Sequence, residues 1–135
     1  MEELACIVLD TDLLVGLLRG EEKAREFIER LWERGDEPVT TAVNIYELYS
    51  GAYRRGPRHV EAVRELERLL PVLQLDAKAA RLAAEIGDGL RRRGAQLEIR
   101  DLLIAAVAVA NSCRVATCNV KHFRRVEALA VERWC

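Results

Sequence analysis

The sequence contains no long apolar run. No window among its 135 residues approaches the roughly 18 uninterrupted apolar side chains that a membrane span requires. The Met1-Glu2-Glu3 start also lacks the basic segment that opens a signal peptide. We therefore expect a cytoplasmic protein with no membrane partner.

Soft metal ligands are scarce as well. The chain has 4 cysteines and 2 histidines, and no two cysteines form a C-x-x-C pair, so we do not expect a zinc site. In a reducing compartment the cysteines are interpreted as small buried apolar side chains, with pairing of one of the last two as the alternative. They are Cys6, Cys113, Cys118 and Cys135.

The chain also lacks an excess of charge of one sign. Its formal net charge is −1, so no global field attracts nucleic acid, and any phosphate contact must be local. Nearly all of the positive charge is arginine, whose guanidinium binds phosphate through a two-pronged fork. The candidate RNA contacts, for which a solvated surface is the alternative role, are Arg54, Arg55, Arg58, Arg91, Arg92, Arg93, Lys121, Arg124 and Arg125.

The composition that remains, 50% hydrophobic and 32% charged, is typical of one globular domain spanning residues 1–135. Apolar runs of strand length alternate with amphipathic stretches of helix length, which indicates an α/β fold. We expect strands over 4–9, 38–41, 71–75, 114–117 and 128–134, helices over 13–18, 21–34, 42–54, 57–70, 77–93 and 100–112, and a turn over 119–123. The predicted architecture is a mainly parallel central sheet of four to five strands, flanked by helices on both faces.

Four polar residues fall near the junctions where predicted strands lead into helices. They are Asp10 after the first strand, Glu47 in the second turn of a helix, Asp101 in the first turn of an apolar helix, and Asn119 after the fourth strand. Because such junctions share one edge of a parallel sheet, we expect these side chains to converge on one cleft. Each has an ordinary alternative role, as a helix cap, a solvated helix residue, an acid at a helix dipole or a turn former.

Three carboxylates in one cleft repel one another, so their convergence predicts a bound cation. Oxygen ligands without histidine or cysteine favour Mg²⁺ or Mn²⁺, and these ions commonly bind the phosphate of a substrate. The sequence therefore predicts chemistry on a phosphodiester.

Four stretches resemble, in order and spacing, the successive motifs of PIN domains and, within that superfamily, of VapC, the ribonuclease toxins of VapBC toxin–antitoxin pairs. The stretches are 8–12, 40–48, 101–106 and 117–123, which together contain the four polar residues above. The resemblance implies that Asp10, Glu47 and Asp101 bind the metal and that Asn119 completes the catalytic set. It also implies that Thr11, Asp12 and Thr117 lie beside the ligands and support them or the substrate.

The same resemblance implies a metal-dependent endoribonuclease that hydrolyses RNA by in-line attack of water and leaves a 5′-phosphate and a 3′-hydroxyl. It further implies a homodimer and a cognate VapB-type antitoxin, whose C-terminal segment lies across a hydrophobic groove. Packing in the core is the alternative role for most of the side chains expected to line that groove, which are Leu13, Leu14, Leu17, Trp32, Tyr46, Tyr49 and Tyr53.

Two other functions fit parts of the pattern. Asp10-Thr11-Asp12 resembles the D-x-D motif of haloacid-dehalogenase-like phosphatases, in which Asp10 would be the nucleophile, although Lys78 and Lys121 lack the settings that those enzymes require. The other alternative is a non-catalytic PIN-like RNA-binding protein, in which Asn119 marks lost activity.

Overall fold

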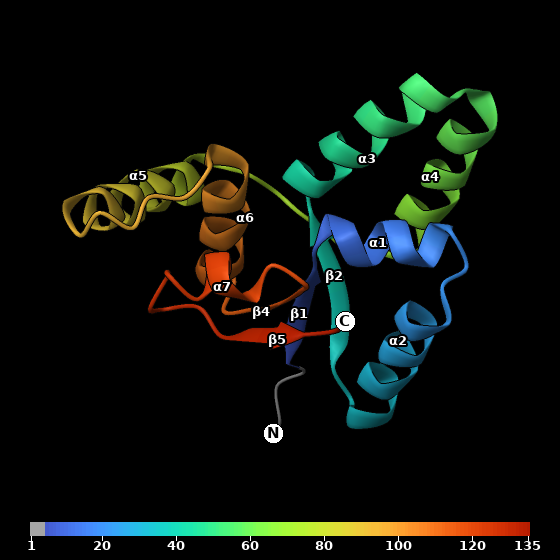
Figure 1. Cartoon of the computed structure of the whole chain (residues 1–135), viewed down its shortest axis with the longest axis horizontal. Coiled ribbons are helices and arrows are strands. Elements are labelled where there is room, and N and C mark those ends of the chain that lie inside the picture. The colour runs from blue at the N-terminus through green and yellow to red at the C-terminus, as the bar shows by residue number, and fades with distance from the viewer. Residues whose placement is uncertain (1–4) are drawn as a thin grey trace.

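The computed structural model describes residues 5–135, so Leu4 of the first predicted strand lies outside the described residues. Strands and helices alternate along the chain as predicted (Figure 1). The strands are β1 (Cys6–Leu9), β2 (Glu37–Thr41), β3 (Val72–Leu73), β4 (Arg114–Thr117) and β5 (Val131–Arg133). The helices are α1 (Thr11–Leu18), α2 (Glu22–Arg34), α3 (Ala42–Arg55), α4 (Pro57–Leu69), α5 (Ala77–Arg92), α6 (Ile99–Ala110) and α7 (Val120–Phe123).

β1 lies at the centre of a five-stranded sheet with the order β3-β2-β1-β4-β5, and every neighbouring pair is parallel. The predicted parallel α/β architecture is thus confirmed. The chain runs from β1 outward to β3 on one side and then crosses to β4 on the other. The carboxyl end of β1 therefore lies at the switch point where open α/β sheets bind their ligands.

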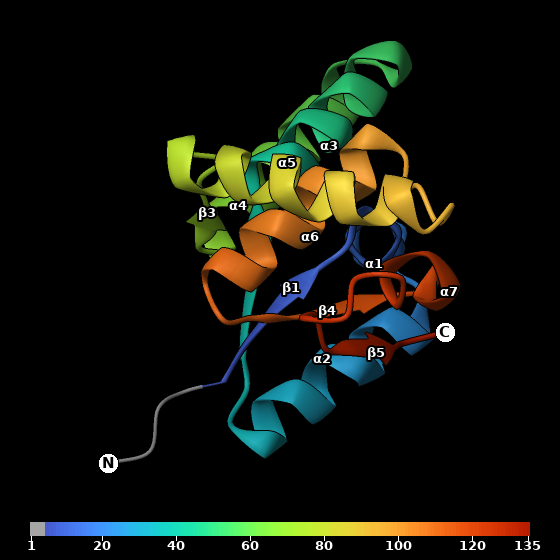
Figure 2. The same ribbon diagram turned by 90° about the vertical axis from the view of Figure 1, so that its left-hand side faces the viewer.

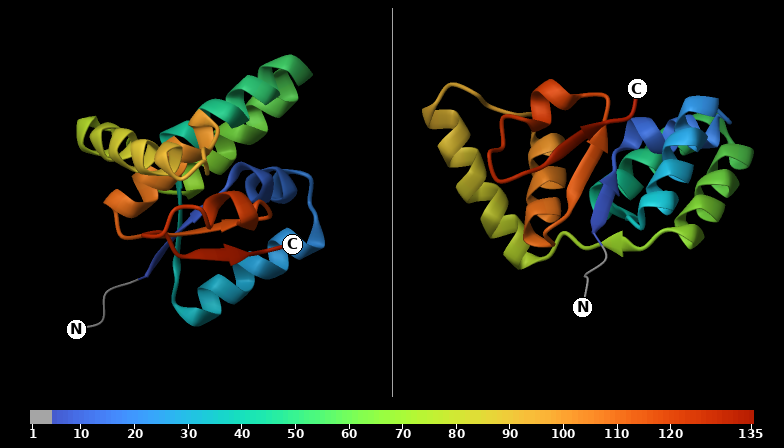
Figure 3. Two further views of the ribbon diagram at one scale, coloured as in Figure 1. Left: turned by 60° about the vertical axis from the view of Figure 1, so that its left-hand side comes forward. Right: turned by 90° about the horizontal axis from the view of Figure 1, so that it is seen from below.

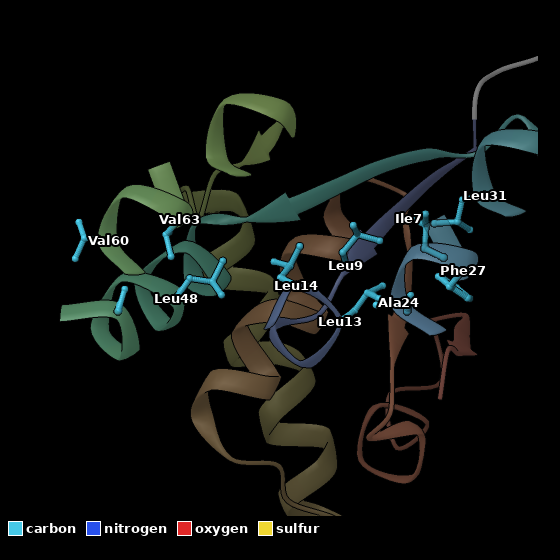
Figure 4. Packing of buried hydrophobic residues seen from close by; sticks show 12 residues of the cluster. Ile7, Leu9, Leu13, Leu14, Ala24, Phe27, Leu31, Leu48, Val60 and Val63 are labelled. Atoms are coloured by element: carbon cyan, nitrogen blue, oxygen red, sulfur yellow. The ribbon is translucent and has the colours of Figure 1, made fainter. Parts of the chain in front are cut away.

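Helices cover both faces of the sheet, with α5 and α6 on one side of the strands and α1 to α4 on the other (Figure 3, right). Alternate residues of β1 serve the two layers, because successive side chains of a strand point to opposite faces. Ile7 and Leu9 pack in one core with Leu14 of α1 and Phe27 of α2 (Figure 4), whereas Val8 belongs to the core built on α6. Burial on both faces explains the uninterrupted apolar run of this strand.

Local sequence signals fix several helix ends. Thr41 and Asp76 accept hydrogen bonds from the first turns of α3 and α5, and Gly35 ends α2 with a positive φ of 78°. Gly87 lies inside α5, where a Cβ would stand 2.9 Å from Leu102 Cδ2. This glycine therefore allows α5 to pack closely on α6, and the helix continues through it.

Two predicted elements differ from the structure in detail. The predicted turn over 119–123 is a single helical turn, α7, which begins directly after Asn119. The two outer strands are shorter than expected, because β3 and β5 pair with a neighbour on one side and hold only 2 and 3 residues.

The interpretation of the cysteines as unpaired buried side chains is wrong, because Cys6 is bonded to Cys113 and Cys118 to Cys135. The sheet brings each pair together. Cys6 and Cys113 lie at the starts of the neighbouring strands β1 and β4, whereas Cys118 and Cys135 lie just beyond the ends of β4 and β5. These pairings depend on which strands are neighbours, and the order of strands in the sequence does not reveal that.

The apolar helix α6 is buried nearly all round, as its composition predicts, with Ile104 and Val107 fully inaccessible. It has 12 residues. Within residues 5–135, no helix combines the length and the apolar character needed to cross a bilayer.

Candidate functional site

Asp10 follows β1 at the carboxyl edge of the sheet and is only 1% exposed. Its Oδ1 accepts hydrogen bonds from the backbone N–H of Thr11 (2.8 Å) and the side-chain amide of Asn44 (3.3 Å), and its Oδ2 accepts one from the Thr117 hydroxyl (2.7 Å). Burial raises the pKa of Asp10 to about 6, and the negative charge of Asp12 acts in the same direction. Asp10 thus caps α1 and also occupies the position expected of a site residue.

Glu47 reaches the same edge from α3. Its Oε1 accepts a 2.6 Å hydrogen bond from the Thr11 hydroxyl, which in turn accepts a 3.0 Å bond from Nδ2 of Asn44. Asn44 is fully buried and, as noted, also binds Asp10, so it couples the two acids through one hydrogen-bond chain. Sequence reasoning missed this role of Asn44. Its spacing of three residues before Glu47, which puts both on one helix face, is the signal that was available.

Asp101 lies in the first turn of α6 and is 2% exposed. Its Oδ1 accepts no hydrogen bond from any residue in the described range, and the Nδ1 atom of His122 lies 3.7 Å from its Oδ2. Burial raises the pKa of Asp101, against the opposing effect of the Arg100 charge. A buried carboxylate oxygen without a partner is unfavourable unless a cation or water completes its contacts.

Arg100 lies between two of these acids. Its Nε forms an ion pair with Oε2 of Glu47, and its Nη1 is 3.3 Å from Oδ1 of Asp101. Burial disfavours the charged guanidinium, but the two carboxylates outweigh this effect and hold the pKa of Arg100 above its ordinary value. Sequence reasoning missed Arg100 too. The available signal was a cation in the first turn of a helix, where the macrodipole disfavours positive charge.

Asp10, Glu47 and Asp101, here called the acid cluster, are therefore gathered at one edge of the sheet, linked through Thr11 and Arg100. Among residues 5–135, no three histidine, cysteine or acidic side chains stand close enough to hold one metal ion in this arrangement. The donor set nevertheless suits a hard divalent cation, since all its ligand atoms are carboxylate oxygens and one of them lacks a hydrogen bond.

The loop between β4 and α7 lies close to α1 (Figure 2), and the Thr117 hydroxyl at the end of β4 donates a hydrogen bond to Asp10. Asp12 accepts hydrogen bonds from the backbone N–H of Cys118 and the indole N–H of Trp134, both at 2.9 Å. The backbone N–H of Asn119 donates to the Thr117 hydroxyl at 2.9 Å, and the Asn119 side chain is exposed at the start of α7. Asp12 therefore fixes the loop that carries Asn119, and it does so together with the C-terminal segment.

A pocket of about 630 Å³ opens beside the acid cluster, between α1, α3 and α4. Thr11 and Glu47 line it at one end, and the candidate RNA contacts Arg54 and Arg55 line it as well. Much of the remaining lining is apolar, including Val15, Leu18, Leu48, Ala52 and Val63. The pocket thus joins an acidic end to a largely apolar trough.

The other candidate RNA contacts lie elsewhere. Arg91 and Arg92 both pair with Asp88 on the exposed side of α5, and Arg93 pairs with Glu127 at 2.8 Å. Lys121 and Arg124 lie in and just after α7, which follows Asn119.

None of the residues expected to line the hydrophobic groove lines this pocket. Leu13 and Leu14 are fully buried core residues, whereas Trp32, Tyr46 and Tyr53 are exposed and do not line it. Leu13 and Leu14 thus follow the alternative of core packing, because helical spacing alone does not tell which face of α1 meets the sheet. Contact between a partner and the exposed side chains stays a prediction.

Comparison with known proteins identifies the family. A family model of the PIN domain matches residues 7–129. The chain belongs to the PIN domain family. Among its PIN relatives, Ribonuclease VapC10 of Mycobacterium tuberculosis is 32% identical over 126 residues, which is 91% of this chain and 90% of the relative. Ribonuclease VapC of Rickettsia bellii is 29% identical over 133 residues, which is 93% of each.

A solved PIN structure agrees with the fold. The crystal structure of DNA-bound VapBC from Salmonella typhimurium matches with a TM-score of 0.85 at 26% identity, over 98% of this chain and 100% of that one. The predicted family resemblance is confirmed. The phosphatase alternative gains no support, because the chain matches the PIN domain and proteins named ribonucleases, and Asp12 accepts hydrogen bonds from Cys118 and Trp134.

Proposed function

We propose that this PIN domain is a divalent-metal-dependent endoribonuclease and the toxin of a type II toxin–antitoxin pair, acting in the cytoplasm. The observation that carries the proposal is the acid cluster at the switch point of the sheet, in which a buried oxygen of Asp101 accepts no hydrogen bond from the described residues. Membership of a family whose curated relatives are named ribonucleases supports the assignment.

Asp10 and Asp101, assisted by Glu47, are the residues proposed to hold Mg²⁺ or Mn²⁺. Such an ion lowers the pKa of a bound water and neutralises charge on a scissile phosphate. Asp10 is held for this role by Thr11 and Thr117, which donate hydrogen bonds to different oxygens of its carboxylate. Positioned ligands reduce the reorganisation that the reaction demands.

Arg54 and Arg55 are proposed to bind RNA phosphates, because they line the pocket that begins at Glu47. The guanidinium fork suits phosphate oxygens. Arg91, Arg92 and Arg93 are weaker candidates, since each is paired with an acidic side chain. Lys121 and Arg124 are proposed contacts on the far side of Asn119.

The proposed activity is tested by incubating purified protein with a mixed RNA substrate in Mg²⁺, Mn²⁺ or EDTA and mapping the ends of the fragments. Cleavage that requires the metal and leaves 5′-phosphates supports the proposal. Metal-independent cleavage, or a folded and metal-loaded protein that cuts no RNA in the absence of any antitoxin, contradicts it.

The partner is proposed to be a VapB-type antitoxin whose C-terminal segment occupies the pocket between α1, α3 and α4. The apolar lining suits an apolar segment, and Glu47 at its end suits a basic side chain of the partner. The chain is also proposed to form a homodimer. Co-expression with the small protein encoded beside it, followed by light scattering on the purified material, tests both proposals. Leu18→Arg, at a partly exposed position of the pocket lining, should abolish capture of the partner and leave the dimer unchanged.

A further inference from the structure

Arg100 lies among the carboxylates that the proposed function assigns to a divalent ion. It forms ion pairs with Glu47 and Asp101, and its positive charge also acts on Asp10. The Asp101 oxygen that Nη1 faces at 3.3 Å is the same Oδ1 that lacks a hydrogen bond. One side chain therefore contacts two of the three acids and influences the third through space.

The negative charges of the acid cluster outnumber the positive charge of the arginine that pairs with them. Three carboxylates stand in the acid cluster, and Arg100 is the arginine paired with them. Among the described residues, no three acidic, histidine or cysteine side chains stand close enough to hold a metal ion, and Arg100 contacts two of the three carboxylates. The guanidinium and a divalent cation thus compete for the same oxygens of Glu47 and Asp101.

We propose that Arg100 is an internal counter-cation, which neutralises the acid cluster in the metal-free protein and must rotate outward before a divalent ion binds. The proposal rests on the proposed metal-dependent function and adds that this one residue sets the metal affinity of the site. Arginine suits the role because its guanidinium remains charged at any ordinary pH, so it leaves the cluster by rotation and not by losing a proton. Its side chain is 35% exposed, which leaves a path toward solvent.

The test is a titration of metal-free protein with Mn²⁺ at pH 8, followed by calorimetry and by the electron paramagnetic resonance signal of the free ion. Arg100→Met removes the charge and keeps the length of the side chain, whereas Arg100→Lys keeps the charge. Arg68→Met is the matched control, because Arg68 is an exposed arginine that pairs with Glu65 on α4. The high pH limits competition by protons for the carboxylates.

We expect Arg100→Met to bind Mn²⁺ at least about tenfold more tightly than the unmodified protein, since a like charge a few ångströms from a dication is repulsive even in a high dielectric. Arg100→Lys should stay within about threefold of the unmodified protein on the same electrostatic ground, and Arg68→Met should not change the affinity. Without metal, Arg100→Met should melt at a lower temperature, and Mn²⁺ should raise its melting temperature more than that of the unmodified protein.

Equal or weaker Mn²⁺ binding by a folded Arg100→Met protein overturns the proposal that Arg100 is a counter-cation. If Arg100 only supported the structure of the site, its removal would lower the affinity for Mn²⁺. If that variant does not fold, Arg100→Gln retains a donor for Glu47 and decides the question by the same criterion. Absence of Mn²⁺ binding in both the unmodified protein and the neutral variants overturns the proposed metal-dependent function together with this inference. Binding by the unmodified protein without tightening in the variants overturns this inference alone.

Discussion

Two clusters of charged side chains lie at opposite edges of the same sheet, and they are built differently. The one at the amino ends of β2 and β4, here called the amino-edge ring, is a closed set of ion pairs: Arg34–Asp36 (2.6 Å), Arg34–Glu132 (3.0 Å), Arg114–Asp36 (2.8 Å) and Arg114–Glu132 (2.8 Å). It holds two positive and two negative groups. The acid cluster at the carboxyl edge has three carboxylates around Arg100.

The pKa values reflect this difference. Burial opposes ionisation of Asp36, but hydrogen bonds from Arg114 and Arg34 outweigh it and lower the pKa of that carboxyl. For Asp10 and Asp101 burial prevails, and the pKa of each is raised. The balanced ring pairs each of its carboxylates with an arginine of the fold, whereas the unbalanced cluster is the place where we propose that a divalent cation binds.

The largest expected effect comes from removing an acid of the cluster. Asp101→Asn should lower the rate of RNA cleavage at least about 10⁴-fold, because the loss of a metal contributing several kcal/mol to the transition state has that consequence. Its free energy of unfolding without metal should change by less than about 1 kcal/mol, since the neutral amide relieves a buried, incompletely paired charge. A fluorogenic RNA assay and urea denaturation measure the two quantities. A folded Asp101→Asn protein with full activity removes this residue from the site.

The two disulfides allow the edges to be compared by stability. Cys6–Cys113 spans 107 residues near the amino edge, and Cys118–Cys135 spans 17 beyond the carboxyl edge. Replacing the first pair by serine should cost about 4 to 5 kcal/mol and replacing the second about 3 kcal/mol, as the longer loop constrains the unfolded chain more. Urea unfolding of the two double variants under non-reducing conditions tests the order. Equal losses, or a larger loss for the shorter loop, contradict it.

A third comparison uses pH. The pKa of Asp10 in the folded protein, about 6, lies above its ordinary value of 3.8, so the folded state binds the extra proton between these values. The contribution of Asp10 to the free energy of unfolding is fully present below pH 3.8 and is lost as the pH rises through 6. The change is about 3 kcal/mol, at 1.36 kcal/mol per pKa unit. Asp36 has the opposite pH dependence, because its pKa is lowered in the folded protein. Its contribution to the free energy of unfolding is present above the ordinary pKa of 3.8 and is lost as the pH falls below that value.

Unfolding free energies of metal-free protein and its Asp10→Asn variant, measured from pH 4 to pH 8, test this sign. The unfolding free energy of the unmodified protein should fall relative to that of Asp10→Asn as the pH rises through the window in which Asp10 titrates. A difference that stays constant throughout contradicts the raised pKa of Asp10.

The smallest effect is expected from opening the amino-edge ring. Asp36→Asn should destabilise the fold by about 2 kcal/mol, because hydrogen bonds between charged groups are lost while Glu132 still pairs with both arginines. Activity per folded molecule should not change, since the ring lies at the other edge of the sheet. Loss of activity in folded Asp36→Asn protein would show that the two edges are coupled.

Much of the architecture follows from local patterns in the sequence. The apolar run before Asp10 predicts a strand buried on both faces, Thr41 and Asp76 predict helix starts, and Gly35 predicts a helix end, all as found. The convergence of Asp10, Glu47 and Asp101 follows from the rule that parallel strands end at one edge.

What the sequence could not supply depends on neighbours in space. The pairing of Cys6 with Cys113 requires β1 and β4 to be adjacent, and the pocket lining requires the orientation of α1 on the sheet. Arg100 was missed because its role is defined by Glu47, 53 residues away in the chain. Charge balance within a cluster is a property of the fold, and it separates the amino-edge ring from the acid cluster more clearly than residue type does.

The central claim is that the acid cluster is a cation site. The most direct measurement is an anomalous difference map from crystals of the metal-free protein soaked in Mn²⁺. The account predicts a peak within coordinating distance of oxygens of Asp10 and Asp101, with the Arg100 guanidinium displaced from Glu47. If crystals soaked in saturating Mn²⁺ show no peak at this position and Arg100 is still paired with Glu47, the result contradicts the claim that the acid cluster is a cation site.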